Sequence, residues 1–256
     1  MTRRRWIADE VHGNTAALLG DHASHLTRVL RAKVGQKFDI AASGSVRLGR
    51  IVSISDSRVE FELGEEQIQK RAPEIALALS IFKFDRMEWA IEKCVEIGVA
   101  RIIPIVARRT DAHLAIAAAK RHERWQRIAR QAAQQSRRTS PPVIDRPVKL
   151  ADLSGTEAPP DVRSGVSGPT NPPSPRPVSF CRIVLAESEN ETRLRDALVS
   201  RPSQVMLAIG PEGGWSADEL QWVRDRGWTS VSLGDTILRA ETAAIVAAAL
   251  ALDALA

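Results

Sequence analysis

Cysteine is scarce in this sequence, since Cys94 and Cys181 are the only two among 256 residues. They lie far apart, and neither has a second cysteine at the spacing of a zinc site or a redox motif. The sequence therefore predicts neither a metal site nor a disulfide framework, and it fits a reducing compartment.

Long apolar runs are also missing. The longest, residues 243–252, is shorter than the roughly 20 residues that a membrane-spanning helix needs. The arginines at positions 3–5 are followed by polar residues and not by the apolar stretch of a signal peptide. We therefore expect no membrane span and a cytoplasmic protein.

Two phosphate-binding motifs are absent. No Gly-Lys-Ser/Thr follows the Gly-rich turn at residues 210–214, which excludes a P-loop, and the G-x-G-x-x-G spacing of dinucleotide-binding folds does not occur there. Aromatic residues make up only 4%, which leaves little surface for stacking single-stranded bases. Basic residues, in contrast, outnumber acidic ones, with 36 Lys and Arg against 31 Asp and Glu, and this excess favours a polyanionic partner.

Two hydropathy patterns divide the chain near Pro73. Residues 1–72 read as short strands around one helix, with strands at residues 38–41, 46–54 and 59–63, and this pattern is typical of a small β-barrel. Residues 73–256 alternate strands with longer helices, which predicts an α/β domain with a mostly parallel sheet. Its predicted strands are residues 75–82, 101–107, 183–186, 205–209 and 231–233, and its predicted helices are residues 86–97, 118–136, 194–199, 217–226 and 241–255.

Two local signals refine the α/β domain. Ser216 and Glu219 stand three apart before an apolar pattern, so a capping box is expected to start a helix directly after the Gly-rich turn. Residues 154–177 hold many prolines, with Gly and Ser filling much of the remainder, and they have almost no large apolar side chain. Such a stretch cannot bury enough surface to offset its ordering entropy, so we predict a flexible insert.

The first candidate functional segment is residues 207–215, Leu-Ala-Ile-Gly-Pro-Glu-Gly-Gly-Trp, which runs from the end of a predicted strand into a Gly-rich turn. Its three glycines let the backbone turn sharply and leave room for a ligand to press against it. Gly-rich turns between a strand and a helix are common, so a purely structural turn is the alternative.

The second segment is residues 233–244, which run from a strand end into an Ala-rich helix and carry Arg239 and Glu241. A catalytic pair is one interpretation. A structural one is that Glu241 is favoured by the helix dipole in a first turn while Arg239 pairs with a neighbouring carboxylate.

Basic residues form two helical stripes. His25, Arg28 and Arg31 share one predicted helix face, with Leu26, Val29 and Leu30 expected on the buried face. Together with Arg3, Arg4 and Arg5 they could form a patch that neutralises phosphates, or they could be an ordinary amphipathic surface. A second stripe lies at three-residue spacing and is more typical of a solvated helix face; it comprises Arg121, Arg124, Arg127 and Arg130.

The motif G-P-E-G-G, followed by L-G-x-x-I-L-R-x-E-T-A near the C-terminus, closely resembles the SPOUT methyltransferase superfamily, and more narrowly the 16S ribosomal RNA uridine-N3 methyltransferases. The likeness spans nearly the whole chain. Further matching stretches are residues 25–31, 83–89, 93–99, 124–125 and 135–138. The sequence departs from that family in having Gln134 in place of Glu, Ala240 in place of Thr, and Asp235-Thr236 in place of Pro and a basic residue.

The resemblance implies a deep trefoil knot in the α/β domain, an N-terminal PUA-like RNA-binding barrel, a homodimer, and N3 methylation of one uridine in 16S ribosomal RNA of the small subunit. It also implies S-adenosylmethionine as the cofactor, held in the knot. The implied cofactor-binding residues are Leu185, Glu187, Ile209, Gly210, Pro211, Glu212, Gly213, Gly214, Leu233, Gly234, Ile237 and Leu238. The implied catalytic residues are Arg239 and Glu241, and the RNA-binding ones are Arg3, Arg4, Arg5, His25, Arg28 and Arg31.

Two other functions compete with this one. Related SPOUT proteins methylate the ribose 2′-oxygen, but the N-terminal barrel and residues 25–31 and 83–99 argue against that reaction. A ribosome-binding assembly factor with a vestigial cofactor pocket is the other, and the retained glycines, Arg239 and Glu241 disfavour it.

Overall fold

The computed structural model describes residues 5–42, 45–67, 74–136, 138–155 and 179–255. The chain forms two compact units, one built on each of two sheets. Arg3 and Arg4 lie outside the described residues. The predicted insert overlaps the 3-10 helix η2 (Leu150–Gly155) at its first two positions, and from residue 156 onward it too lies outside them.

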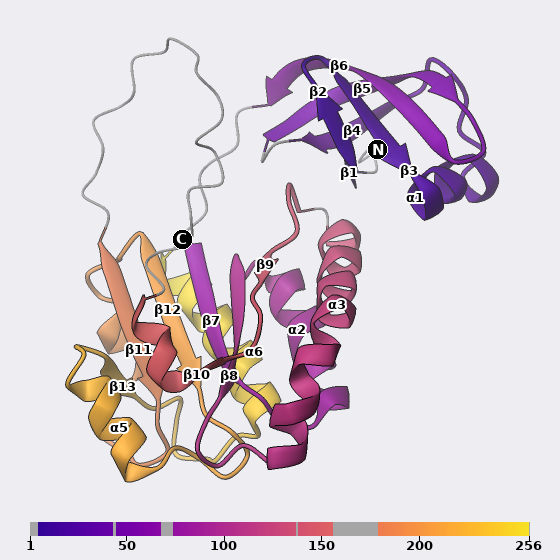
Figure 1. Ribbon diagram of the computed structural model, residues 1–256. Helices are drawn as coiled ribbons and strands as arrows, with labels where there is room; N and C mark the ends of the chain where they lie inside the picture. Colours follow the sequence, from indigo (N-terminus) through magenta and orange to yellow (C-terminus); the bar gives the residue numbers. More distant parts are fainter. Residues whose placement is uncertain (1–4, 43–44, 68–73, 137, 156–178, 256) are drawn as a thin grey trace. The chain divides into compact units, whose positions relative to one another are not determined.

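The N-terminal unit is a six-stranded sheet with the order β1-β4-β5-β6-β3-β2 (Figure 1). Strand β1 pairs in parallel with β4, and the other neighbours are antiparallel. Leu18, Ile40 and Phe61 are fully buried in its core. The strands are β1 (Arg5–Ile7), β2 (Glu10–His12), β3 (Thr15–Leu19), β4 (Lys37–Ala42), β5 (Ser45–Ile54) and β6 (Arg58–Gln67). The three predicted strands are β4, β5 and β6; the sequence did not predict the other three.

The helix predicted around residues 25–31 differs in the structure. A short α1 (Gly20–Ser24) continues into a π-helix, η1 (His25–Val29), whose wider turn is marked by the bond from the Leu30 N–H to the His25 carbonyl. Leu26 is buried as expected, but the prediction for Val29 is wrong, because its side chain is 65% exposed. A π-turn holds more residues than the 3.6 of an α-helix, so residues three apart no longer share a face.

The second unit confirms the predicted α/β fold with a parallel sheet. Its sheet has the order β10-β8-β7-β12-β11-β13, with β9 also pairing with β8, and every pair is parallel. The strands are β7 (Glu74–Ser80), β8 (Arg101–Val106), β9 (Val143–Ile144), β10 (Val148–Lys149), β11 (Phe180–Leu185), β12 (Gln204–Ile209) and β13 (Thr229–Val231). The helices are α2 (Phe84–Ile97), α3 (Ala112–Gln135), α4 (Leu194–Ala197), α5 (Ala217–Arg224) and α6 (Ala240–Leu255).

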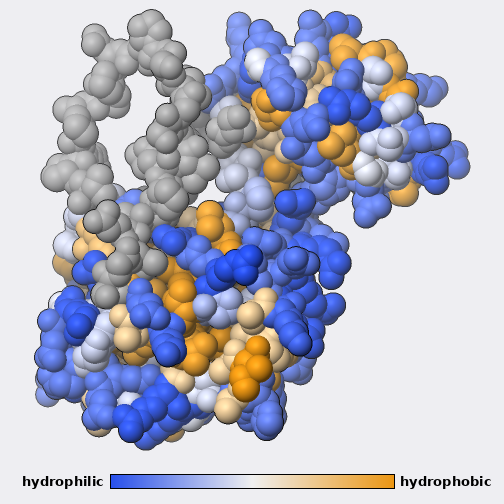
Figure 2. All heavy atoms as spheres, in the orientation of Figure 1, coloured by the Kyte–Doolittle hydropathy of each residue, from blue (hydrophilic) through white to orange (hydrophobic). Residues whose placement is uncertain are grey.

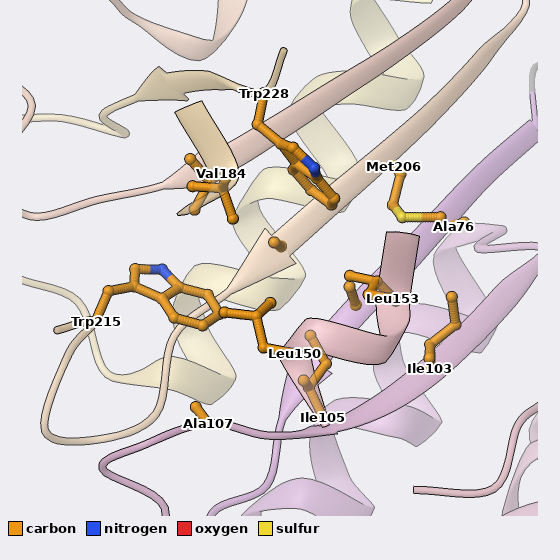
Figure 3. Packing of buried hydrophobic residues seen from close by; sticks show 13 residues of the cluster. Ala76, Ile103, Ile105, Ala107, Leu150, Leu153, Val184, Met206, Trp215 and Trp228 are labelled. Atoms are coloured by element: carbon orange, nitrogen blue, oxygen red, sulfur yellow. The ribbon is translucent and has the colours of Figure 1, made fainter. Parts of the chain in front are cut away.

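Alternate residues of each strand supply two cores, because successive side chains point to opposite faces of a sheet. Helix α6 packs on β7 and β12 on one face and also against α2. On the other face, Ala76 and Met206 join a cluster with η2 residues Leu150 and Leu153 and with Trp215 (Figure 3). The visible surface of both units is mainly hydrophilic, with apolar residues in patches between polar ones (Figure 2). Among the described residues, no helix has the length and apolar character needed to cross a bilayer.

The strand order creates a switch point in this sheet. Strand β11 lies between β12 and β13, so the chain leaves β12, passes through α5, and returns on the far side of β11. Because the strands are parallel, the loops that follow them emerge at one edge. Ligand sites of open α/β sheets form at such points, outside the carboxyl ends of the strands.

Candidate functional site

A cavity of about 500 Å³ lies at the carboxyl ends of β11, β12 and β13. Each of these strands contributes its last residue and the loop that follows it. The lining comprises residues 185–188 and Asn190 after β11, residues 209–215 with Leu220 after β12, residues 231–240 with Ala243 after β13, and Arg109 from the loop after β8.

All the residues that the sequence predicted for cofactor binding line this cavity. They are Leu185, Glu187, Ile209, Gly210, Pro211, Glu212, Gly213, Gly214, Leu233, Gly234, Ile237 and Leu238. Segments some 50 residues apart in the sequence are thus brought to one site, and apolar side chains alternate in it with backbone groups and charged residues. Such a mixture is typical of small-molecule sites.

Trp215 joins two of the lining loops. Its indole N–H donates a hydrogen bond of 2.9 Å to the Leu185 carbonyl at the end of β11. Its ring is buried and points toward Leu150 in the apolar cluster (Figure 3). A methyl group on Gly210 would lie 3.1 Å from the indole nitrogen, so this position has room for glycine only while the indole stays where it is. Trp215 therefore fixes the shape of the Gly-rich loop.

Arg109 is a lining residue that sequence reasoning missed. Its Nη1 donates to the Gly213 carbonyl at 2.8 Å and so braces the Gly-rich loop from the neighbouring β8 loop. Gly214 has a φ of +69°, a backbone conformation that favours glycine. Ser188, Asn190 and Ser232 also line the cavity without having been predicted. None of the four stands in a motif, so no spacing could have identified them.

The structure separates the two predicted catalytic residues. Arg239 is exposed and lines the cavity. Glu241 is only 6% exposed, lies in the first turn of α6, and is not part of the lining. Its Oε1 is 3.9 Å from Nε of Arg86, while no interaction between Glu241 and Arg239 occurs among the described residues. The carboxylate thus faces a residue of α2 and does not orient Arg239 directly.

Two further ion pairs surround the cavity. Arg86 also reaches Glu212 of the Gly-rich loop, with Nη1 2.9 Å from Oε1. Arg193, which precedes α4, lies 2.7 Å from Asp235 in the loop after β13. Asp235 belongs to the pair Asp235-Thr236, which departs from the Pro and basic residue of the resembled family, and here its carboxylate is paired with Arg193. The cavity therefore carries mixed charges, several of them already paired.

The predicted RNA-binding residues belong to the other unit. His25, Arg28 and Arg31 are exposed, and Arg5 is half-buried on β1. The His25 ring lies 5.7 Å from the ring of Trp6, which places the start of η1 beside β1. Within the part of the chain that the structure describes, Arg28 and Arg31 form no ion pair, so their charges remain available to a polyanion.

The second arginine stripe is partly neutralised. Arg124 makes two hydrogen bonds to Glu88 of α2, at 2.6 and 2.8 Å. Arg121 lies 3.7 Å from the same carboxylate and 4.8 Å from the Phe84 ring. These contacts favour the interpretation of that stripe as a helix face that packs on α2 and meets solvent.

The cysteines offer no reactive group. Burial raises the pKa of the Cys94 thiol to about 12, and burial also raises the pKa of Cys181. A nucleophilic cysteine needs the opposite shift. No group of histidine, cysteine and carboxylate residues within the described ranges is arranged to hold a metal ion.

The chain is similar to known proteins along most of its length. The model of an RNA methyltransferase domain matches residues 69–252. The ribosomal RNA small subunit methyltransferase E of Synechocystis is 30% identical over 237 residues, which cover 92% of this chain and 72% of the relative.

Two solved structures are similar in fold and sequence. A methyltransferase from Legionella pneumophila in complex with SAM has a TM-score of 0.77 and 26% identity, with 99% of this chain and 98% of the other covered. A ribosomal RNA small subunit methyltransferase E from Neisseria gonorrhoeae, bound to S-adenosyl methionine, has a TM-score of 0.74 and 26% identity, with 97% and 96% covered.

Proposed function

The chain belongs to the RNA methyltransferase domain family, and from that premise we propose that it methylates N3 of one uridine in 16S ribosomal RNA of the small subunit. Methylation of small-subunit ribosomal RNA with S-adenosylmethionine follows from the relatives and from the cofactor-bound neighbours. The uridine and the N3 atom rest on the resemblance of residues 207–215 and 233–244 to the uridine-N3 enzymes.

The cavity at the carboxyl ends of β11, β12 and β13 is the observation that carries this proposal. Its volume of about 500 Å³ lies within the range of pockets that hold small ligands. The residues present fit the cofactor. Leu185, Ile209 and Leu238 supply apolar walls for an adenine ring, and the backbone around Gly210 and Gly234 supplies polar groups.

S-adenosylmethionine supplies an activated methyl group when it is bound. The protein's part in such a displacement is to hold the acceptor atom in line with the methyl carbon and to exclude water. The hydrogen bonds from Trp215 to Leu185 and from Arg109 to Gly213 hold the loops after β8, β11 and β12 at fixed positions relative to one another.

Arg239 is assigned to the reacting base. The N3–H of uracil has a pKa roughly two units above neutral, so removal of its proton at pH 7 costs about 2.7 kcal/mol. An exposed guanidinium at the cavity can stabilise the resulting anion through charge-assisted hydrogen bonds. Glu241 is buried outside the cavity lining and serves the site through Arg86.

The N-terminal unit is assigned to RNA binding as a PUA-like module. His25, Arg28 and Arg31 are each exposed at its surface although the π-turn puts them on different sides of the helix, and Arg28 and Arg31 have no acidic partner among the described residues. Phosphates held in place by a folded RNA match such a surface better than a flexible strand does, since the unit offers few aromatic side chains for stacking.

A homodimer and a trefoil knot complete the proposal. Helix α6 is apolar nearly all round, and Leu250 on it and Trp89 on α2 are each 48% exposed. An apolar surface on two helices that pack together suits a second copy of the chain. The return of the chain from β12 past β11 to β13 is compatible with threading through a knot, an exception among protein folds. The expected compartment is the cytoplasm, where ribosomal subunits are found.

Mass mapping of nucleosides tests the reaction. Small subunits that lack the modification are incubated with the protein and S-adenosylmethionine, and we expect one added methyl group on the base of one 16S uridine, at N3. Arg239→Ala is expected to lower turnover about 100-fold, in line with the loss of one charge-stabilising donor, while cofactor affinity changes little. A methyl group on a ribose oxygen would refute the N3 assignment. An unchanged rate in Arg239→Ala would remove this residue from the mechanism.

A further inference from the structure

Arg86 stands between two carboxylates that come from two different segments of the site. Its Nη1 is 2.9 Å from Oε1 of Glu212 in the Gly-rich loop, and its Nε is 3.9 Å from Oε1 of Glu241 in the first turn of α6. We propose that Arg86 is a positioning residue for methyl transfer, which holds the Gly-rich loop through Glu212 and the start of α6 through Glu241. This inference rests on the proposed function.

Glu241 depends on Arg86 because of its burial. The residue is 6% exposed, and its Oε2 has no hydrogen-bond partner among the described residues. A buried carboxylate is costly unless a positive charge or several donors compensate it. The guanidinium of Arg86 is the cation that the structure places against it. Removal of Arg86 takes away the cation beside this buried carboxylate, so that the first turn of α6 shifts to expose it to water or the carboxylate takes up a proton.

A shift of that turn would reach Arg239. The Ala243 N–H donates to the Arg239 carbonyl at 2.8 Å, so Arg239 is the point at which the loop after β13 joins the helix. The Arg239 side chain itself is exposed and makes no hydrogen bond or ion pair with another described residue. Its position therefore follows the helix start, which Glu241 and Arg86 fix.

Arg86 also holds the Gly-rich loop, through its contact with Glu212. Glu212 lies between Gly210 and Gly213, in a loop that needs glycine for its shape and has few side chains of its own to anchor it. The bond from Arg86 ties this loop to α2, and the bond from Arg109 to the Gly213 carbonyl ties it to the loop after β8. Arg86 and Arg109 together hold the loop at two neighbouring positions.

The test is a cycle of four variants of the full-length protein: Arg86→Ala, Arg86→Lys, Glu241→Gln and the double variant Arg86→Ala/Glu241→Gln. Turnover on undermodified small subunits, the Kd of S-adenosylmethionine by calorimetry and the melting temperature are measured for each. Arg108→Ala is the matched control. It removes an arginine whose ion pair with Asp218 is exposed, at 67% and 80% for the two side chains, and which does not line the cavity.

We expect Arg86→Ala to lower kcat about 100-fold, the effect of a small misplacement of a reacting group, and to raise the Kd of the cofactor several-fold. Arg86→Lys keeps the cation but not the fork that reaches Glu212 and Glu241 together, so it should recover only part of the lost rate. In the double variant the buried charge is gone, so the melting temperature should return toward that of wild type. Its turnover should fall no further than in Arg86→Ala, because two residues that act as one unit are not additive.

Three results would overturn the inference. One is an Arg86→Ala variant that melts early but, per folded molecule, turns over at the wild-type rate, because this would make the contact purely structural. A second is full additivity of the Arg86 and Glu241 effects on kcat. The third is a wild-type protein without turnover, which would refute the proposed function and this inference with it, whereas the first two leave the proposed function standing.

Discussion

Gly210 and Gly213 lie three positions apart in one loop, yet they have different room for a methyl group. A Cβ on Gly210 would lie 3.1 Å from the Trp215 indole nitrogen, whereas on Gly213 the nearest atom is 3.4 Å away, an ordinary contact. Gly210→Ala must therefore displace the indole and its bond to Leu185. We expect it to weaken S-adenosylmethionine binding about tenfold in calorimetry, the value of one hydrogen bond of about 1.4 kcal/mol. Gly213→Ala changes the same loop without touching the indole, and full cofactor affinity in Gly210→Ala would contradict this role of Trp215.

Cys94 makes the stability of the protein depend on pH in the alkaline range. Burial raises its pKa in the folded state to about 12 from an ordinary value of 9.0, so only the unfolded chain loses this proton between those two values. The free energy of unfolding should thus keep its full value below pH 9 and fall above it, and Cys94 alone should account for up to about 1.4 kcal/mol per pH unit. The chain has no tyrosine, which removes the usual phenol titration from this range.

Urea unfolding at pH 8, 9, 10 and 11 measures this effect, with Cys94→Ala for comparison. The variant loses a buried sulfur and is less stable at pH 8, but its stability should decline less steeply above pH 9. Parallel curves for the two proteins would show that Cys94 is not the group responsible.

At the scale of elements, the capping box of α5 is the best-defined local signal. The Ser216 Oγ accepts from the Glu219 N–H at 3.3 Å, and the Glu219 carboxylate accepts from the Ser216 N–H at 2.9 Å. Loss of such a cap costs about 1 kcal/mol. Ser216→Ala should therefore lower the free energy of unfolding by about that amount in urea melts, whereas Ser53→Ala at an exposed strand position should leave it unchanged. Equal stability of both variants would mean that the box adds nothing.

Elements with strong local signals were predicted well. The capping box and the five apolar strands from β7 to β13 agree with the structure to within a few residues. The start of α3 was predicted at residue 118 and lies at Ala112, because the Asp111 carboxylate accepts from the His113 N–H at 2.8 Å and begins the helix earlier. Strands β9 and β10 have two residues each and are too short to show periodicity. The π-turn at residues 25–29 has no sequence signature, so Val29 was placed on the wrong face.

Only those parts of the candidate site that lie in motifs directly after a strand could be predicted from the sequence. Residues 209–215 and 233–239 carry glycines and charged residues in recognisable order, and the cavity is lined by both segments. Arg86 and Arg109 come from loops and helices more than 100 residues earlier in the chain, and only the folded sheet brings them to Glu212 and Gly213. Their roles depend on tertiary contacts that no spacing reveals.

At the scale of the whole molecule, binding to the ribosomal particle should depend steeply on salt. Each arginine that neutralises a phosphate contributes about 0.7–0.9 to the slope of log K against log salt. Arg28→Ala/Arg31→Ala should therefore reduce the magnitude of the slope by roughly 1.4–1.8 in filter-binding assays from 50 to 200 mM salt. Arg50→Ala is the control in the same unit, because Arg50 is already paired with Glu62 at 2.6 Å. Equal slopes for all three proteins would exclude residues 28 and 31 from phosphate contacts.

The pairing of β7 with β12 also sets the order in which the chain can fold during its own synthesis. Glu74 pairs with Gln204, 130 residues later, whereas every strand pair of the first sheet lies within residues 5–67. A ribosome that adds 5–20 residues per second needs roughly 10 s to supply β12 after β7 has been made. The first sheet can close in that time. During this interval β7 lacks its central partner strand β12, although its residues Ile75, Leu77 and Leu79 are fully buried in the folded protein. The nascent chain therefore needs a chaperone most at this stage.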